Sequence, residues 1–159
     1  MTWLDLDRIK IVEFTGPDGV DALRDDIELL IQQFDSYDPD FVDWAKEHPE
    51  ILTLVYVDDE PAAYIRIDDF DVGKESLEFS GCVMPEYRDG GLTERISPVA
   101  IRNAFRRTGK KKMLATIKEH NRPAQFAIVN LGFRRIGRDA NKDLLYRLDR
   151  TTALAQKTF

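Results

Sequence analysis

One stretch of the sequence decides the fold: Cys82-Val83-Met84-Pro85-Glu86-Tyr87-Arg88-Asp89-Gly90-Gly91-Leu92-Thr93. It begins as the end of an apolar strand, passes through a proline-containing turn and a loop with paired glycines, and continues into a helical pattern. A strand that leads through a glycine-rich turn into a helix N-terminus directs several backbone N–H groups toward one point. Such a point binds anions, most often phosphate. The stretch therefore predicts a phosphate-binding loop.

The segments on both sides of this loop predict a mixed α/β domain. Alternating or continuous apolar runs indicate strands, and apolar residues at helical spacing indicate helices. The expected strands are 8–14, 51–57, 62–67, 76–84, 112–118, 133–138 and 143–148, and the expected helices are 20–34, 41–46, 91–107 and 123–131. The strands between the second and third helices predict an antiparallel meander, and the helix at 91–107 predicts one parallel βαβ pair. We expect a mostly antiparallel mixed sheet with helices on both faces.

The composition predicts one compact domain. A chain of 159 residues, 43% of them hydrophobic, suits a single full core. We place this domain at residues 1–150 and expect a frayed tail at 151–159. The single cysteine excludes an intramolecular disulfide, and no apolar run approaches the ~20 residues of a membrane span. The first residues lack the pattern of a signal peptide. We therefore expect a soluble cytoplasmic protein.

The charges are distributed unevenly along the chain. Residues 1–85 carry 22 acidic and 6 basic side chains, whereas residues 86–159 carry 7 acidic and 17 basic ones. Two interpretations remain open: solvated surfaces, or a basic half that faces a polyanionic ligand and an acidic half that receives a cationic one. The sequence pI of about 5.0 opposes attraction to a phosphate backbone, so nucleic acid is not expected as the main partner.

The loop and its downstream signature resemble the GCN5-related N-acetyltransferase (GNAT) superfamily. The family's phosphate loop has the pattern Arg/Gln-x-x-Gly-x-Gly/Ala, which corresponds here to residues 88–93, after a Val-x-Pro-x-Tyr segment at 83–87. The family then has a strand, an Asn, a short helix and Leu-Gly-Phe, which correspond to Asn121 and residues 131–133. The order of elements matches over nearly the whole chain. The resemblance implies the GNAT fold, in which the parallel strand pair splays apart at the cofactor.

The resemblance also implies a ligand, acetyl-CoA as acyl donor, and no metal. In the family the pantetheine arm lies along the splayed end of the strand before the loop, and the pyrophosphate lies on the loop's N–H groups. The implied cofactor-binding residues are Cys82, Val83, Met84, Arg88, Asp89, Gly90, Gly91, Leu92, Thr93 and Asn121. Asn121 is equally interpreted as a helix cap, and the two roles are compatible.

Three residues depart from the family pattern. Thr93 replaces the second Gly or Ala of the loop, where its side chain either crowds the phosphate or donates a hydrogen bond to it. Pro98 lies within the following helix, so we expect a kink or a delayed helix start. Ile128 stands where many members carry a tyrosine that protonates the leaving CoA thiolate.

Acyl transfer to an amine requires a base for the amine, a donor to the thioester carbonyl and an acid for the leaving sulfur. The backbone N–H of Val83 is the family-like donor. For the base we prefer Glu78 over Glu75, because Glu78 shares a strand face with Ser80 and Cys82. The alternative for Glu78 is a solvated or paired carboxylate.

The missing tyrosine leaves the proton donor open. Tyr87 is our first candidate, and Tyr64 and His120 are the alternatives. We expect Cys82 to be a small packed residue, because GNAT chemistry is direct transfer.

Two functions follow. The first is an acetyl-CoA-dependent N-acetyltransferase that acts on a primary amine of a small molecule or protein, and the acidic first half favours a cationic acceptor. The second is a catalytically silent GNAT-like module that binds CoA or a protein partner. The sequence does not decide the oligomeric state, and a homodimer is one alternative.

Overall fold

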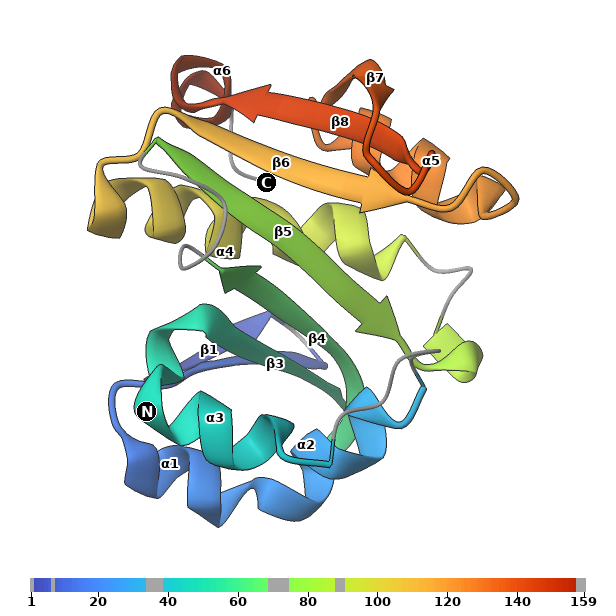
Figure 1. Ribbon diagram of the computed structural model, residues 1–159. Coiled ribbons are helices and arrows are strands. Elements are labelled where there is room, and N and C mark those ends of the chain that lie inside the picture. Colours follow the sequence, from blue (N-terminus) through green and yellow to red (C-terminus); the bar gives the residue numbers. More distant parts are fainter. Residues whose placement is uncertain (1, 7, 34–38, 69–74, 88–90, 157–159) are drawn as a thin grey trace. The chain divides into compact units, whose positions relative to one another are not determined.

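The computed structural model describes residues 2–6, 8–33, 39–68, 75–87 and 91–156 (Figure 1). The chain divides into two compact units. Unit 1 comprises residues 1–66 and 81–92, and unit 2 comprises residues 67–80 and 93–159. Strands β4 (Glu60–Asp68) and β5 (Ser76–Val83) each contribute residues to both units. That residues 1–150 form one domain stays a prediction.

Unit 1 contains an antiparallel meander of β1 (Thr2–Leu6), β2 (Ile9–Glu13), β3 (Leu52–Val57) and β4. The β3–β4 hairpin turns through Asp58 and Asp59, whose φ angles of 50° and 67° lie in the left-handed region. Two cations of the neighbouring β2 segment hold this turn, because Arg8 pairs with Asp58 and Lys10 Nζ lies 2.5 Å from Asp59 Oδ1. The expected strand at 8–14 and the hairpin are confirmed, whereas β1 was not expected.

Three helices cover one face of the meander in unit 1 (Figure 1). They are α1 (Pro17–Ala22), α2 (Arg24–Ile31) and α3 (Phe41–Glu47), followed by the 3-10 turn η1 (Pro49–Ile51). The prediction of one helix over 20–34 is wrong, because Leu23 leaves helical geometry (φ −113°, ψ 22°) and separates α1 from α2. The apolar spacing continues through this break, so Val20 and Ile27 are both buried in one core with Leu54.

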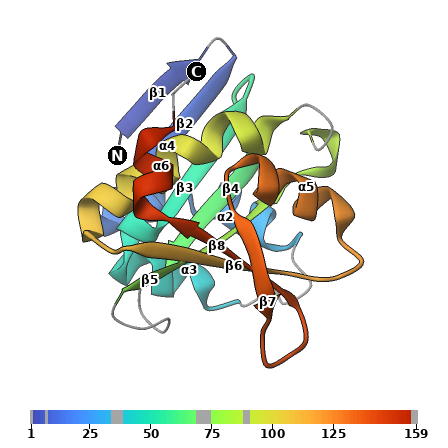
Figure 2. The same cartoon turned by 90° about the horizontal axis from the view of Figure 1, so that it is seen from above.

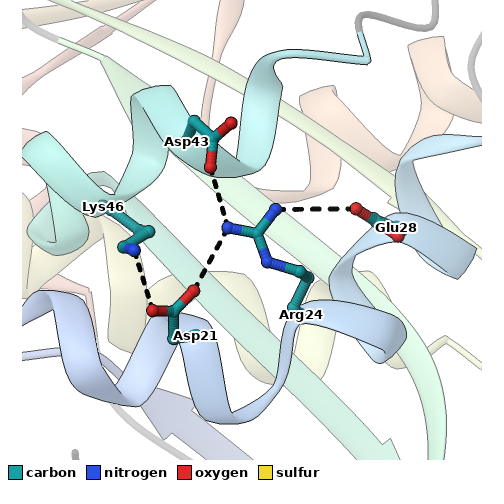
Figure 3. Close-up of polar contacts among 5 residues, drawn as sticks. All are labelled: Asp21, Arg24, Glu28, Asp43 and Lys46. Atoms are coloured by element: carbon teal, nitrogen blue, oxygen red, sulfur yellow. Dashed lines mark hydrogen bonds and ion pairs between the residues drawn. The ribbon is translucent and has the colours of Figure 1, made fainter.

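An ion network joins the three helices on their exposed side (Figure 3). Arg24 Nη2 lies 3.1 Å from Asp21 Oδ1 and 2.8 Å from Asp43 Oδ1, and Arg24 Nη1 lies 3.8 Å from Glu28 Oε1. Lys46 Nζ completes the network at 2.7 Å from Asp21 Oδ2. Hydrogen bonds from Lys46 and Arg24 lower the pKa of Asp21. Each pair is solvent-exposed and weak, but together the pairs link α3 to the break between α1 and α2.

Unit 2 contains the parallel part of the sheet, in the strand order β5-β6-β8-β7. β5 pairs in parallel with β6 (Lys112–Ile117), and β6 and β7 (Arg134–Arg138) pair antiparallel with β8 (Leu144–Asp149). The helix between β5 and β6 is α4 (Leu92–Thr108), and α5 (Arg122–Asn130) follows β6. These bounds lie within one or two residues of the expected ones. The predicted mixed sheet with one parallel βαβ pair is confirmed.

The expectation of a frayed C-terminal tail is wrong, because residues Arg150–Ala155 form helix α6 directly after β8 (Figure 2). The residue after this helix, Gln156, donates from Nε2 to the Leu131 carbonyl at 3.0 Å. Gly132 makes room for this contact, since a Cβ built there would lie 2.2 Å from Gln156 Nε2. Tertiary contacts therefore hold residues 150–156, which a six-residue helical pattern alone does not predict.

Candidate functional site

The end of β5 and the turn after it form the part of the expected site that lies in unit 1. The Met84 N–H donates to the Ala62 carbonyl of β4 at 2.8 Å, and the Tyr87 N–H donates to the Met84 carbonyl at 2.9 Å. The second bond belongs to the 3-10 turn η2 (Pro85–Tyr87). Met84 is half-buried against the core of unit 1. The chain after β5 thus stays hydrogen-bonded to β4 as far as Met84, and it leaves β4 at the turn η2.

Two glycines allow this geometry. A Cβ at Gly81 would lie 2.9 Å from the Tyr64 carbonyl oxygen, closer than real Cβ atoms come, so β4 and β5 approach each other here only because residue 81 has no side chain. Gly91 has a φ of 68°, which glycine adopts without strain. The expected site residues Arg88, Asp89 and Gly90, and the side chain of Cys82, lie outside the part of the chain that the structure describes.

In unit 2 the parallel pairing of β5 covers only its first residues. The register joins Ser76 to Lys112 and Glu78 to Leu114, whereas β6 pairs with β8 along its whole length as far as Ile117. Among the described residues of unit 2, the register between β5 and β6 ends at Glu78. In the family that the chain resembles, the pantetheine arm lies where the pairing of these two strands has ended.

The two carboxylates considered as bases are both exposed. Glu75 is engaged at the start of β5, because its carboxylate lies 3.4 Å from Lys111 Nζ and its carbonyl accepts from the N–H groups of Lys111 and Lys112. Glu78 is exposed on β5. These contacts give Glu75 a structural role and are compatible with the preference for Glu78, whose catalytic role stays a prediction.

Helix α4 starts at Leu92, directly after Gly91, as a phosphate-binding loop requires. Thr93, in the first turn, is half-buried. The helix continues through Pro98 to Thr108, so the proline neither ends it nor delays its start beyond one residue. The Ser97 hydroxyl next to the proline is buried and has no hydrogen-bond partner among the described residues.

Asn121 is the N-cap of α5. Its Oδ1 accepts a hydrogen bond from the Ala124 N–H at 3.3 Å, which confirms the interpretation as a helix cap. The segment before it is fixed from two sides, because Gln125 Nε2 donates to the Glu119 carbonyl at 2.8 Å and Arg138 holds the Glu119 carboxylate. The contact of Asn121 with a cofactor arm stays a prediction.

The tyrosine candidates lie in different surroundings. Tyr64 is 6% exposed and packs against Phe41 at a centroid distance of 6.4 Å, so it is a core residue. Tyr87 is half-buried, in the 3-10 turn η2. Ile128 is buried at 3% exposure, so no proton donor is available at that position.

Two polar contacts of unit 1 were not predicted from the sequence. The Arg66 guanidinium lies over the rings of Trp44 (4.4 Å) and Phe41 (5.2 Å). The Tyr56 hydroxyl donates to Asp26 Oδ2 at 2.7 Å, and burial, with this bond, raises the pKa of Tyr56. The signal for Arg66 was its two-residue spacing from Tyr64, which places both on one strand face. Nothing in the local sequence relates Tyr56 to Asp26, which is 30 residues away.

The described residues were also compared with the requirements of a metal site and of a membrane-spanning helix. Within those ranges, no group of three or more His, Cys, Asp and Glu side chains is arranged to hold a metal ion. No described helix is long and apolar enough to cross a membrane.

A family model matches most of the chain. Residues 18–133 match the family model described as acetyltransferase (GNAT) family. No curated protein matches the chain.

Solved structures share the fold. An acetyltransferase (GNAT family) from Bacillus anthracis has a TM-score of 0.66 at 15% identity, over 94% of this chain and 99% of that one. The protein yncA from Salmonella typhimurium, with its cofactor acetyl-CoA, has a TM-score of 0.66 at 17% identity, over 91% and 95%. A mutant of the spermidine N-acetyltransferase SpeG from Vibrio cholerae has a TM-score of 0.69 at 12% identity, over 94% and 98%.

Proposed function

The chain belongs to the acetyltransferase (GNAT) family, and from this premise we propose that it transfers the acetyl group of acetyl-CoA directly to a primary amine. The observation that carries the proposal is the family match, which covers well over half of the chain and includes the strand, the loop and the helix start of the opening stretch. The acetyl-CoA bound in the similar Salmonella typhimurium structure supports the choice of donor.

We assign the acyl donor to the end of β5 and the loop after it. Cys82, Val83 and Met84 would follow the pantetheine arm, residues 88–93 would bind the pyrophosphate, and Asn121 would contact the arm. The bond from the Met84 N–H to β4 supports this, because it holds the strand end straight up to the turn. Gly91 at positive φ, directly before the N-terminus of α4, supports the phosphate site.

The chemistry requires three roles. Glu78 takes a proton from the acceptor ammonium group, and the neutral amine nitrogen attacks the thioester carbonyl carbon. The backbone N–H of Val83 stabilises the negative charge that develops on the carbonyl oxygen. The C–N bond forms and the C–S bond breaks, and Tyr87 gives its phenolic proton to the departing CoA sulfur. The attacking nitrogen then loses its second proton, which restores the phenol of Tyr87, and Glu78 releases the first proton to water, so that one proton is set free for each acetyl group transferred.

The acceptor proposed here is a cationic amine, either of a small molecule or of a protein. The acidic first half of the chain supports it, since a field of negative charge raises the local concentration of cations. Part of that charge is already compensated, because Arg24 and Lys46 hold Asp21 and Asp43. The exposed Asp18 and Asp25 add to the field. We expect this activity in the cytoplasm.

The direct test is the release of free CoA thiol from acetyl-CoA with a panel of polyamines, amino acids, aminoglycosides and N-terminal peptides. We expect turnover with at least one cationic amine. Glu78→Gln should lower kcat by 10²- to 10⁴-fold, on the order of a lost general base, and should leave the KM for acetyl-CoA within about twofold. Absence of turnover across the panel, or an unchanged kcat in Glu78→Gln, would contradict the assignment.

A second candidate function is a catalytically silent module that binds CoA or a protein partner. Ile128, buried where many family members carry the proton-donating tyrosine, favours it. A thermal-shift titration with acetyl-CoA, read beside the turnover assay, separates the two candidates, because any ligand that binds the folded state raises Tm. A shift with acetyl-CoA without turnover supports the silent module, and turnover abolished by Tyr87→Phe supports the enzyme with Tyr87 as acid.

A further inference from the structure

Arg102 is a buried cation that none of the proposed chemistry uses. It lies on α4 in unit 2 and is 6% exposed. Its Nη1 donates to the Gln156 carbonyl at 3.4 Å, which is long for an N–H···O bond. A guanidinium has five N–H donors. Among the described residues, no carboxylate pairs with this group.

The electrostatic surroundings of Arg102 disfavour its positive charge. Burial lowers the pKa of Arg102, and the positive charge of Arg106, one turn further along α4, lowers it more. Buried charges in proteins are nearly always paired, because desolvation of a lone ion is costly. The Gln156 carbonyl is neutral and engages one donor, and no other guanidinium nitrogen of Arg102 is among the described buried atoms without a partner, so solvent reaches those nitrogens.

The surroundings of Arg102 are fixed. Gln156, which supplies the carbonyl, is itself anchored by the bond from its side-chain amide to the Leu131 carbonyl. Its amide lies so close to Gly132 that a Cβ there would come within 2.2 Å. The Arg102 position is also separate from the phosphate loop, since ten residues of helix from Leu92 span about 15 Å.

We propose that Arg102 binds a phosphate-sized oxyanion at this position in unit 2. The planar guanidinium presents paired N–H groups that match two oxygens of one phosphate, sulfate or carboxylate. Because only 6% of Arg102 is exposed, we take the ligand to be a small anion. The 17 basic against 7 acidic residues of positions 86–159 attract such an anion from solution.

The experiment is thermal unfolding of the full chain in a phosphate-free buffer, titrated with sodium phosphate at constant ionic strength. We expect Tm to rise by about 2–4 °C at tenfold the dissociation constant and to keep rising with the logarithm of the phosphate concentration. Arg102→Met should show a smaller rise, limited to what phosphate bound at residues 88–93 contributes. In the phosphate-free buffer Arg102→Met should unfold at the wild-type temperature or above it, because an apolar residue of similar length removes an uncompensated charge.

Arg107→Gln is the matched control, because Arg107 is exposed on the same helix and the substitution removes the same charge. It should keep the full response. Phosphate bound at residues 88–93 does not confuse the result, since both variants retain that loop.

Equal responses in wild type and Arg102→Met, or no response in the wild type, would overturn the proposal. Arg102→Lys decides the case if Arg102→Met does not fold. Lysine keeps the positive charge but lacks the paired N–H groups of the planar guanidinium. We therefore expect calorimetry to show a phosphate affinity at least tenfold weaker in Arg102→Lys. An unchanged affinity would also overturn the proposal.

Discussion

Adding a single methyl group at Gly81 perturbs the contact that positions the end of β5. In Gly81→Ala the new Cβ would lie 2.9 Å from the Tyr64 carbonyl oxygen and 3.8 Å from the Ile65 Cα. The close neighbour is a backbone atom of β4, so it cannot rotate away as a flexible side chain could. The two strands must separate by a few tenths of an ångström or more. The Met84 N–H, three residues further along β5, would lose its good alignment with the Ala62 carbonyl.

The size of the effect follows from two opposing contributions. Overpacking of a tight contact costs about 1–3 kcal/mol, and the loss of glycine's freedom in the unfolded chain offsets about 0.4–1 kcal/mol. A net cost of about 1–2 kcal/mol lowers Tm by about 2–8 °C in a chain of this length. Because the same shift moves Val83 and Met84, we expect the Kd for acetyl-CoA to rise about tenfold, equivalent to about 1.4 kcal/mol.

The assay is thermal unfolding together with calorimetric titration of acetyl-CoA. Gly16→Ala is the control, since its Cβ would meet no atom within 4 Å and its backbone is extended. As an N-cap substitution it costs below about 1 kcal/mol, and it should leave the Kd unchanged. If Gly81→Ala matched the wild type in both Tm and Kd, the positioning role of the β4–β5 contact would be refuted.

Three further predictions concern stability. Asp58→Asn should lower Tm at pH 7 and approach the wild type as the pH falls below the ordinary carboxyl pKa of about 4, because the hydrogen bond from its arginine partner lowers the pKa of Asp58 and this stabilisation is lost as the pH falls through the lowered pKa; parallel Tm curves between pH 2 and 7 would contradict this. Tyr56→Phe should cost about 1.5 kcal/mol, the contribution of a hydrogen bond to a charged acceptor, and equal Tm values for Tyr56→Phe and wild type would show that the bond to Asp26 contributes nothing. Gln156→Ala should lower Tm by about 2–4 °C, since it leaves the Leu131 carbonyl without its donor, whereas the exposed Thr151→Ala on the same helix should not.

The sequence was most informative where one local pattern determined the structure. The strand, the glycine-containing turn and the helix after it are encoded by neighbouring residues, and Leu92 starts α4 within one residue of the expected position. The cap by Asn121 and the end of α5 before Gly132 are local too. The βαβ unit follows from the order of these elements and the handedness of such crossovers.

Features fixed by distant contacts could not be predicted. The apolar spacing of residues 20–34 continues through the break at Leu23, so the pattern alone could not separate α1 from α2. Strand β1 is five residues long and pairs only with β2, and α6 depends on contacts of Gln156 with Leu131 and Arg102. Short elements of this kind are stabilised by tertiary packing, which local propensity does not report.

In the candidate site, too, the local pattern predicted some features and distant contacts determined others. The family pattern identified the loop, but it offered no proton donor, because Ile128 occupies the tyrosine position and is buried in the core. The surroundings of Glu75 and Tyr64 came from the structure, which shows one in an ion pair and the other packed on Phe41.

The central claim is that this chain moves an acetyl group from acetyl-CoA to a primary amine. Mass spectrometry of the acceptor, run beside thiol detection in the same reaction, tests it most directly. We predict one acetyl group on the amine nitrogen for each CoA thiol released, with both signals lost together in Glu78→Gln. Thiol release without an acetylated amine, or an unmodified acceptor across the whole amine panel, would contradict the claim.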